Sequence, residues 1–193
     1  MPFFRMLPQI ALLLFLVLSA VSAVSPGTAQ AQLLGADPLI DAVERDNFDA
    51  VKKALLGGSS ANIRGGNRYT ALMIASGIGS LDTVELLLAR GAIVDLVEDE
   101  GNTALMFAAL NDRDEVITML LDGHAAIDHA NKQGETPLMR AAEKGSEFAV
   151  LELLARGADP TLTDFTGRTA LDRAKENRRN QIVQIFRKAG IQR

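Results

Sequence analysis

The stretch TALMIA, residues 70–75, sets the repeat that decides the fold. Three variants follow it at a constant interval of 33 residues: TALMFA (103–108), TPLMRA (136–141) and TALDRA (169–174). A second phrase keeps the same register: VELLLARGA (84–92), ITMLLDGHA (117–125) and VLELLARGA (150–158). Self-similarity at a fixed period of this length is typical of stacked helical repeats. The sequence therefore predicts a solenoid built from similar units.

The register extends in both directions, through DPLIDA (37–42) at one end and IVQIFRKAG (182–190) at the other. Five units are therefore predicted, at about 32–64, 65–97, 98–130, 131–163 and 164–193, and they are called units 1 to 5 below. The two outer units carry polar stretches, as the ends of a repeat array require to stay in water. Residues 32–193 are predicted to form one repeat domain and little else.

Each unit reads as a short helix, a tight turn, a second helix and a loop. A Thr precedes the first helix in units 2 to 5, where its hydroxyl can accept a hydrogen bond from a free backbone N–H. A Leu and an Ala three residues later form one face that packs on the neighbouring unit. The second helix carries a denser apolar stripe and ends at Gly, a residue that readily closes a helix in the left-handed conformation. The predicted fold is all-α.

This pattern of Gly-x-Thr-Ala/Pro-Leu, then Ala-Ala, then Val-x-x-Leu-Leu and Gly-Ala resembles the ankyrin repeat family, over nearly the whole of residues 32–193. The resemblance implies helix pairs joined by hairpin-like loops and stacked into a curved solenoid with a concave groove. It also implies a protein-binding module without catalytic activity.

The chain departs from the family pattern at several positions. The His that usually follows Thr-Pro-Leu is replaced by Ile40, Met73, Met106, Met139 and Asp172, so the polar contacts that it normally makes across repeats must be absent or replaced. His124 and Arg68 stand where other units have Gly, and we expect Gly123 and the GGN stretch (65–67) to take the left-handed conformation in their place.

Residues 1–31 are predicted to be a secretory signal peptide. Arg5 precedes a 15-residue apolar run (10–24), which is shorter than the roughly 20 residues needed to cross a bilayer. AQA (29–31) offers a cleavage site before Gln32, and VSA (21–23) offers a second. An uncleaved membrane anchor is the alternative. After cleavage no membrane association is expected.

The composition and the motifs of the chain exclude several kinds of functional site. The chain has no Cys and a net charge of −4, which excludes disulfides and thiolate ligands and gives no reason to expect a nucleic acid partner. No phosphate-binding loop, Gly-x-Ser-x-Gly motif or paired-carboxylate signature is present. The sequence predicts no enzyme, no cofactor and no metal site.

The alternative function is a metal- or redox-responsive periplasmic protein. His124 and His129 lie in DGHAAIDH (122–129), but their spacing does not place both rings on one helical face. The Met73, Met106 and Met139 column could meet oxidants if exposed, although Met more often fills gaps in a core.

Residues at equal positions in successive ankyrin units are expected to line up in rows across the groove. The positions at which the residue type changes from unit to unit indicate where a partner binds. Apolar residues gather in units 2 and 3, whereas units 4 and 5 are charged at the same positions. The residues predicted to bind a partner protein include three polar ones from the acidic loop 95–102: Tyr69, Ile74, Ile78, Asp99, Glu100, Asn102, Phe107 and Leu110.

The function predicted from sequence is therefore an exported, non-catalytic, monomeric module that captures a partner protein on its groove. The periplasm is the first choice of compartment, and secretion is the second.

Overall fold

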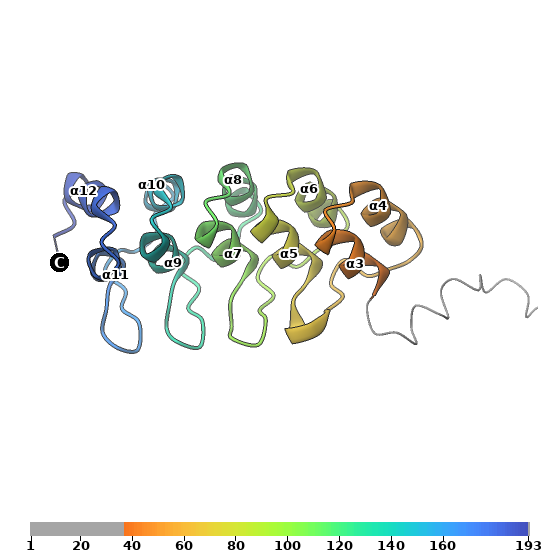
Figure 1. Ribbon diagram of the computed structural model, residues 1–193, viewed down its shortest axis with the longest axis horizontal. Coiled ribbons are helices and arrows are strands. Elements are labelled where there is room, and N and C mark those ends of the chain that lie inside the picture. The colour runs from red at the N-terminus through yellow and green to blue at the C-terminus, as the bar shows by residue number, and fades with distance from the viewer. Residues whose placement is uncertain (1–36, 193) are drawn as a thin grey trace, which may run out of the picture. The chain divides into compact units, whose positions relative to one another are not determined.

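The computed structural model describes residues 37–192, which form five helix pairs (Figure 1). The first helices of the pairs are α3 (Pro38–Glu44), α5 (Ala71–Ile78), α7 (Ala104–Leu110), α9 (Pro137–Lys144) and α11 (Ala170–Glu176). The second helices are α4 (Phe48–Leu56), α6 (Leu81–Ala89), α8 (Asp114–Asp122), α10 (Glu147–Ala155) and α12 (Asn180–Lys188). The predicted signal peptide lies outside the described residues.

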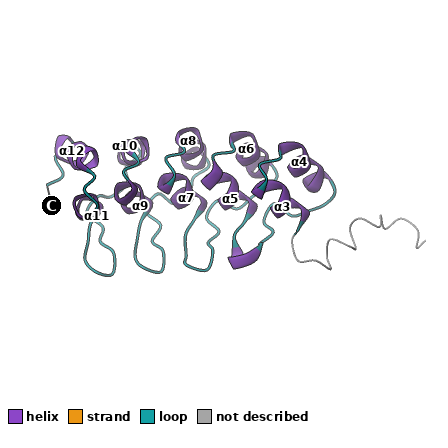
Figure 2. Ribbon diagram, in the orientation of Figure 1, coloured by secondary structure: helices purple, strands orange, loops and turns teal. Residues whose placement is uncertain are grey.

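The two kinds of helix form two rows, and the loops between units extend away from the row of first helices (Figures 1 and 2). These loops close like hairpins, since Glu98 N–H donates to the Asn102 carbonyl and Asn131 N–H to the Glu135 carbonyl. Within residues 37–192 the structure is helical, with a single isolated bridge between Arg64 and Thr70 and no strand. The predicted all-α ankyrin solenoid with hairpin-like loops is confirmed.

The first helices begin as the sequence predicts. The hydroxyls of Thr70, Thr103, Thr136 and Thr169 accept hydrogen bonds from backbone N–H groups three residues on. In two units the residue at the usual histidine position contacts the cap of its own helix: Met73 sulfur accepts from Thr70 N–H at 3.4 Å, and the Asp172 carboxylate accepts from Thr169 N–H at 3.1 Å. Both contacts lie within a single unit and reinforce the start of its first helix.

The core runs between neighbouring first helices. Its repeated Leu and Ala are at most 4% exposed: Leu39, Leu72, Leu105, Leu138, Leu171, Ala42, Ala75, Ala108, Ala141 and Ala174. Each fully buried Leu contributes about 1.5–3 kcal/mol of transfer free energy. The small Ala lets the next helix approach, so one phrase builds the whole stack.

Both expectations about compensating glycines are wrong. Gly123 has φ −77° and His124 itself is left-handed at φ 62°, because the closing bond from Ala125 N–H to the Leu120 carbonyl fixes the backbone at position 124. Arg68 is likewise left-handed at φ 61°, while Gly65 has φ −82°. The repeat geometry therefore holds where the usual residue is lost.

Two kinds of contact alternate at the junctions between units. At junctions 2–3 and 4–5, Arg113 and Arg179 donate to the carbonyls of Gly77 and Glu143, at 3.1 and 2.9 Å. Their side chains lie on Gly79 and Gly145, where any Cβ would come within 2.9 Å of them.

At junctions 1–2 and 3–4 the position of that Gly is held by Asp instead. Asp46 accepts from the Ser80 hydroxyl, and Asp112 accepts from Ala149 N–H. Asp46 and Asp112 therefore help to hold their junctions together.

None of the helices within residues 37–192 combines the length and apolar character that a membrane-spanning helix requires.

Candidate protein-binding face

Five of the predicted binding residues lie in, or directly before, two neighbouring first helices. Tyr69 precedes α5, Ile74 and Ile78 lie in α5, and Phe107 and Leu110 lie in α7. All five side chains are half-buried, so each keeps some surface open to solvent. We call this set the apolar face.

The apolar face is organised around an aromatic pair. The ring centroids of Tyr69 and Phe107 are 5.4 Å apart and the ring planes are tilted by 52°. Gly77 lies across from Phe107, where a Cβ would stand 3.7 Å from the Phe107 Cβ. Tilted aromatic pairs of this kind contribute about 0.5–1.5 kcal/mol beyond their buried area. The two rings therefore form a packed, partly exposed apolar surface.

A hollow of about 390 Å³ adjoins the aromatic pair, between α3 and α5. Its lining residues are Ile40, Glu44, Gly65, Gly66, Tyr69 and Ile74. Tyr69 and Ile74 thus belong to both the hollow and the apolar face.

The three polar residues predicted with them lie in the loop of unit 3 and make contacts within the protein. Asp99 is 3.8 Å from Arg68 in an exposed ion pair, and the Glu100 carboxylate accepts from Gln133. Asn102 is held by Glu98 and Asn131, at 2.7 and 2.9 Å. Their positions are therefore explained by loop architecture, and Asn102 in particular joins two adjacent loops.

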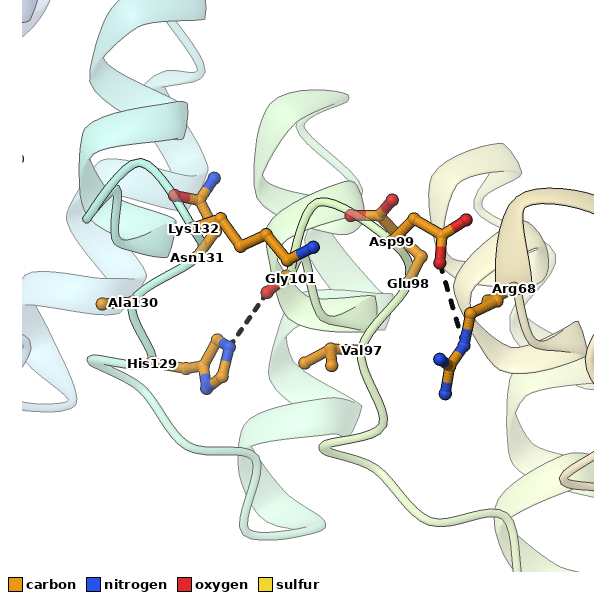
Figure 3. A pocket seen from close by; sticks show the side chains of 9 residues that line it. All are labelled: Arg68, Val97, Glu98, Asp99, Gly101, His129, Ala130, Asn131 and Lys132. Carbon is orange, nitrogen blue, oxygen red and sulfur yellow. Dashed lines mark hydrogen bonds and ion pairs between the residues drawn. The ribbon is translucent and has the colours of Figure 1, made fainter.

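A second hollow of about 390 Å³ opens between these loops (Figure 3). Arg68 and Asp99 pair at one side, and His129 Nε2 is 3.0 Å from the Gly101 carbonyl at the other (Figure 3). The loop acids Asp95 and Glu98 are also used internally, since they accept hydrogen bonds from the backbone N–H groups of Ala126 and Asn102. Most of the acidic loop is therefore occupied in building the hairpins.

In units 4 and 5 the positions equivalent to the apolar face carry charges that pair with each other. Arg173 replaces Phe107 in register, and its guanidinium lies 2.6–2.7 Å from Asp164, Glu143 and Glu135. Arg140 is 3.3 Å from Glu135, and Arg168 is 3.1 Å from Asp164. Most of the charges at these positions are therefore paired within the protein.

Asp164 is the centre of this network. Burial alone would raise the pKa of Asp164, but the Thr166 hydroxyl, the Arg168 backbone N–H and the Arg173 guanidinium donate to its carboxylate. Together they hold the pKa of Asp164 well below its usual range. The same pairing raises the pKa of Arg173 against the effect of its own burial.

The residues of the metal- or redox-responsive alternative are placed as follows. Met73, Met106 and Met139 are each 1% exposed, so their sulfur atoms lie within the stack. His124 is exposed at the end of α8, and His129 lies in the following loop. In the part of the chain that the structure describes, no three His, Asp or Glu side chains come together to hold a metal ion. No observation thus favours this alternative.

Several exposed apolar side chains were missed by the sequence reasoning. Phe165 is 79% exposed at a loop tip, and Leu56 and Leu151 on second helices are 67% and 52% exposed. The sequence could have indicated Phe165, because it is the aromatic residue at a position where the preceding units have Gly66, Asp99 and Lys132. For Leu56 and Leu151 the apolar stripe of the second helix gives no such contrast.

Comparison with known proteins agrees with the architecture. The family model for ankyrin repeats (3 copies) matches residues 39–131 and 116–192, which together cover most of the chain. Ankyrin repeats are generally protein–protein interaction modules, and proteins of this kind are typically non-catalytic. A search among curated proteins gave no match. The helix pairs, their 33-residue register and the family match together show that this chain belongs to the ankyrin repeat family.

Proposed function

We propose that the chain is an exported, monomeric module that captures a partner protein on the apolar face. The observation that carries the proposal is the contrast along the first helices. Units 2 and 3 expose part of an aromatic pair and three aliphatic side chains, whereas the charged residues at the same positions in units 4 and 5 pair with one another.

An aromatic pair flanked by aliphatic side chains suits a protein partner. Binding energy in protein interfaces concentrates in a few well-packed residues, in which aromatic side chains are over-represented. The rings of Tyr69 and Phe107 are already packed, so they lose little conformational freedom on binding. Partner binding is then shape-complementary, with no reaction.

The test exchanges residues in register. The double variant Tyr69→Asn and Phe107→Arg introduces the residues that the repeat carries at Asn102 and Arg140. We expect this variant of residues 32–193 to keep its helical content and to lose the protein that the unmodified chain captures from a periplasmic extract. The matched control is Leu56→Ala with Leu151→Ala, two exposed apolar residues on second helices. If the Tyr69→Asn, Phe107→Arg variant still captures the protein and the Leu56→Ala, Leu151→Ala variant does not, the binding face lies on the second helices and the proposal is wrong.

Export is supported by the charged start, the apolar run and the two small-residue cleavage sites of residues 1–31. We propose the periplasm as the compartment, with no membrane association after cleavage and no nucleic acid partner. Fusing residues 1–31 to a phosphatase that is active only outside the cytoplasm tests the export. N-terminal sequencing of the released chain then distinguishes cleavage after Ala31 from cleavage after Ala23, and an inactive fusion contradicts export.

A further inference from the structure

The surroundings of Arg173 in unit 5 provide a template for interpreting the hollow near Tyr69. Three carboxylates surround the guanidinium of Arg173: Asp164 from the loop before its helix, Glu143 at the end of α9 and Glu135 from the loop before α9. The Arg173 side chain is only 7% exposed. Junction 4–5 therefore contains a basic side chain held by the repeat itself.

The hollow near Tyr69 corresponds in register to the site of the Arg173 network, three units earlier in the chain. Ile74 stands at the position of Arg173, Gly65 at that of Asp164, and Glu44 at that of Glu143. All three line the hollow. Ile is shorter than Arg and Gly has no side chain, so the space that the Arg173 network fills in unit 5 is left open here, at about 390 Å³.

Glu44 is the part of the template that remains. Within residues 37–192 no basic side chain forms an ion pair with Glu44, and its neighbour Arg45 is paired with Asp41 at 2.8 Å. The other two junctions lack this combination, because Gly77 and Leu110 occupy the position of Glu44 there. Junction 1–2 thus keeps a carboxylate and lacks the arginine.

We infer that the hollow binds a basic side chain, arginine or lysine, supplied by the partner protein. This inference rests on the proposed function and deepens it by naming the chemistry of the partner. The aliphatic part of the side chain would lie along Ile40 and Ile74, and its charged end would reach Glu44. Tyr69 also lines the hollow, and a cation placed over its ring would gain a further attraction. An apolar residue next to the basic one would cover the Tyr69–Phe107 pair.

The charge of the chain favours this occupant. Residues 32–167 contain twenty-two acidic and eleven basic residues, so a basic segment is attracted toward units 1 to 4. Residues 168–193 have more basic than acidic residues, and their helices lie at the end of the stack opposite α3 (Figure 1). Two arginines flank the hollow, and both are held by other groups: Arg68 pairs with Asp99, and Arg64 donates to the Val97 carbonyl.

The binding test uses a phage-displayed random peptide library on residues 32–193, with counter-selection on the variant Ile74→Arg. That variant restores the arginine of the template and should occupy the hollow itself. We expect the peptides retained only by the unmodified chain to share an Arg or Lys beside an apolar residue. A selected peptide remade with Gln in place of that basic residue should bind about tenfold more weakly, as expected for loss of one charge-assisted hydrogen bond.

Variants of Glu44 separate this inference from the proposed function. Glu44→Gln should remove the preference for the basic peptide over its Gln version, whereas Glu85→Gln, a change at an exposed residue of α6, should not. Peptides that depend on Tyr69 and Phe107 but contain no basic residue, or whose preference survives Glu44→Gln, overturn the inference alone. If Tyr69→Asn with Phe107→Arg removes no selected peptide, the proposed function falls too.

A measurement without ligand tests the geometric premise. If the hollow accepts a guanidinium, Ile74→Arg should form an ion pair with Glu44. The melting temperature of the Ile74→Arg variant should then fall when Glu44→Gln is added, more than that of the unmodified chain falls with the same change. Equal effects in the two backgrounds would show that Glu44 does not reach the hollow and would overturn the inference.

Discussion

The ring of Phe165 lies directly on the backbone of Gly134. A Cβ atom on Gly134 would be 2.7 Å from Phe165 Cδ1 and 2.9 Å from the Phe165 backbone nitrogen. That nitrogen donates to the Gln133 carbonyl at 3.0 Å, which holds the loop of unit 5 on the loop of unit 4. Gly134 is also left-handed, with φ 76°.

Gly134→Ala should therefore destabilise the protein more than Gly167→Ala. Gly167 has nearly the same φ, 80°, but nothing within 4 Å of an added Cβ. Placing Ala in the left-handed region costs about 1–2 kcal/mol at either site, and the clash at Gly134 should add about 1–3 kcal/mol. Urea unfolding followed by circular dichroism measures the difference, and equal losses would contradict the contact.

The left-handed residues at the ends of α8 and α10 permit a reciprocal exchange. His124 and Gly157 occupy the same register position, with φ 62° and 92°. His124→Gly should raise the free energy of unfolding by about 1 kcal/mol, because Gly adopts this conformation without steric cost. Gly157→His should lower it by a similar amount. Thermal unfolding of both variants checks the signs, and a loss with His124→Gly would show that the His124 side chain contributes a contact.

Ser76 should be better replaced by alanine. Its hydroxyl oxygen is fully buried, and no hydrogen-bond partner for it is found among residues 37–192. Units 3 and 4 have Ala109 and Ala142 at this position. Ser76→Ala should stabilise by about 1 kcal/mol, since an unpaired buried hydroxyl is costly and Ala favours the helix.

Thr103→Ala is the matched change in the opposite direction. The Thr103 hydroxyl accepts from Met106 N–H, so its removal should cost about 1 kcal/mol. Chemical denaturation of both variants measures the two effects. A destabilised Ser76→Ala variant would mean that the Ser76 hydroxyl has a partner after all.

The stability of units 4 and 5 should depend on acid pH through Asp164. Its pKa is lowered in the folded state by the donors around it, whereas an unfolded Asp titrates at about 3.9. The stability that this carboxylate contributes is therefore fully present above about pH 5 and is lost as the pH falls toward the lower folded pKa. Asp164→Asn should be less stable at neutral pH and should lose less of its stability on acidification. Unfolding midpoints at a series of pH values provide the measurement, and parallel curves for variant and unmodified chain would contradict the assignment.

The sequence predicted the architecture because one period fixes helices, caps and core at once. The Leu and Ala of the repeated phrase are buried wherever they recur. The two errors, at His124 and Arg68, arose from assigning backbone conformation by residue type, whereas the closing hydrogen bonds of the repeat decide it.

The candidate site was predictable only in part. Tyr69 and Phe107 are distinctive residues at two different repeat positions in neighbouring units, and their mutual packing depends on the distance between α5 and α7. The hollow beside Glu44 exists because Ile74 and Gly65 are smaller than Arg173 and Asp164, which stand at the same positions in unit 5. That side chains of different units meet there is shown only by the structure, in the contact between Arg173 and Glu143.

The alternation of the junctions limits how an array of this kind can change in length. Arg113 and Arg179 need a glycine in the preceding unit, and the Asp46 and Asp112 junctions instead need a group that donates to the carboxylate. Deleting unit 2 or unit 4, or copying unit 3, would place one of these arginines against an Asp where the structure has a glycine. Removing or copying two adjacent units would restore the alternation, so the unit of growth for this chain is a pair of repeats, 66 residues long.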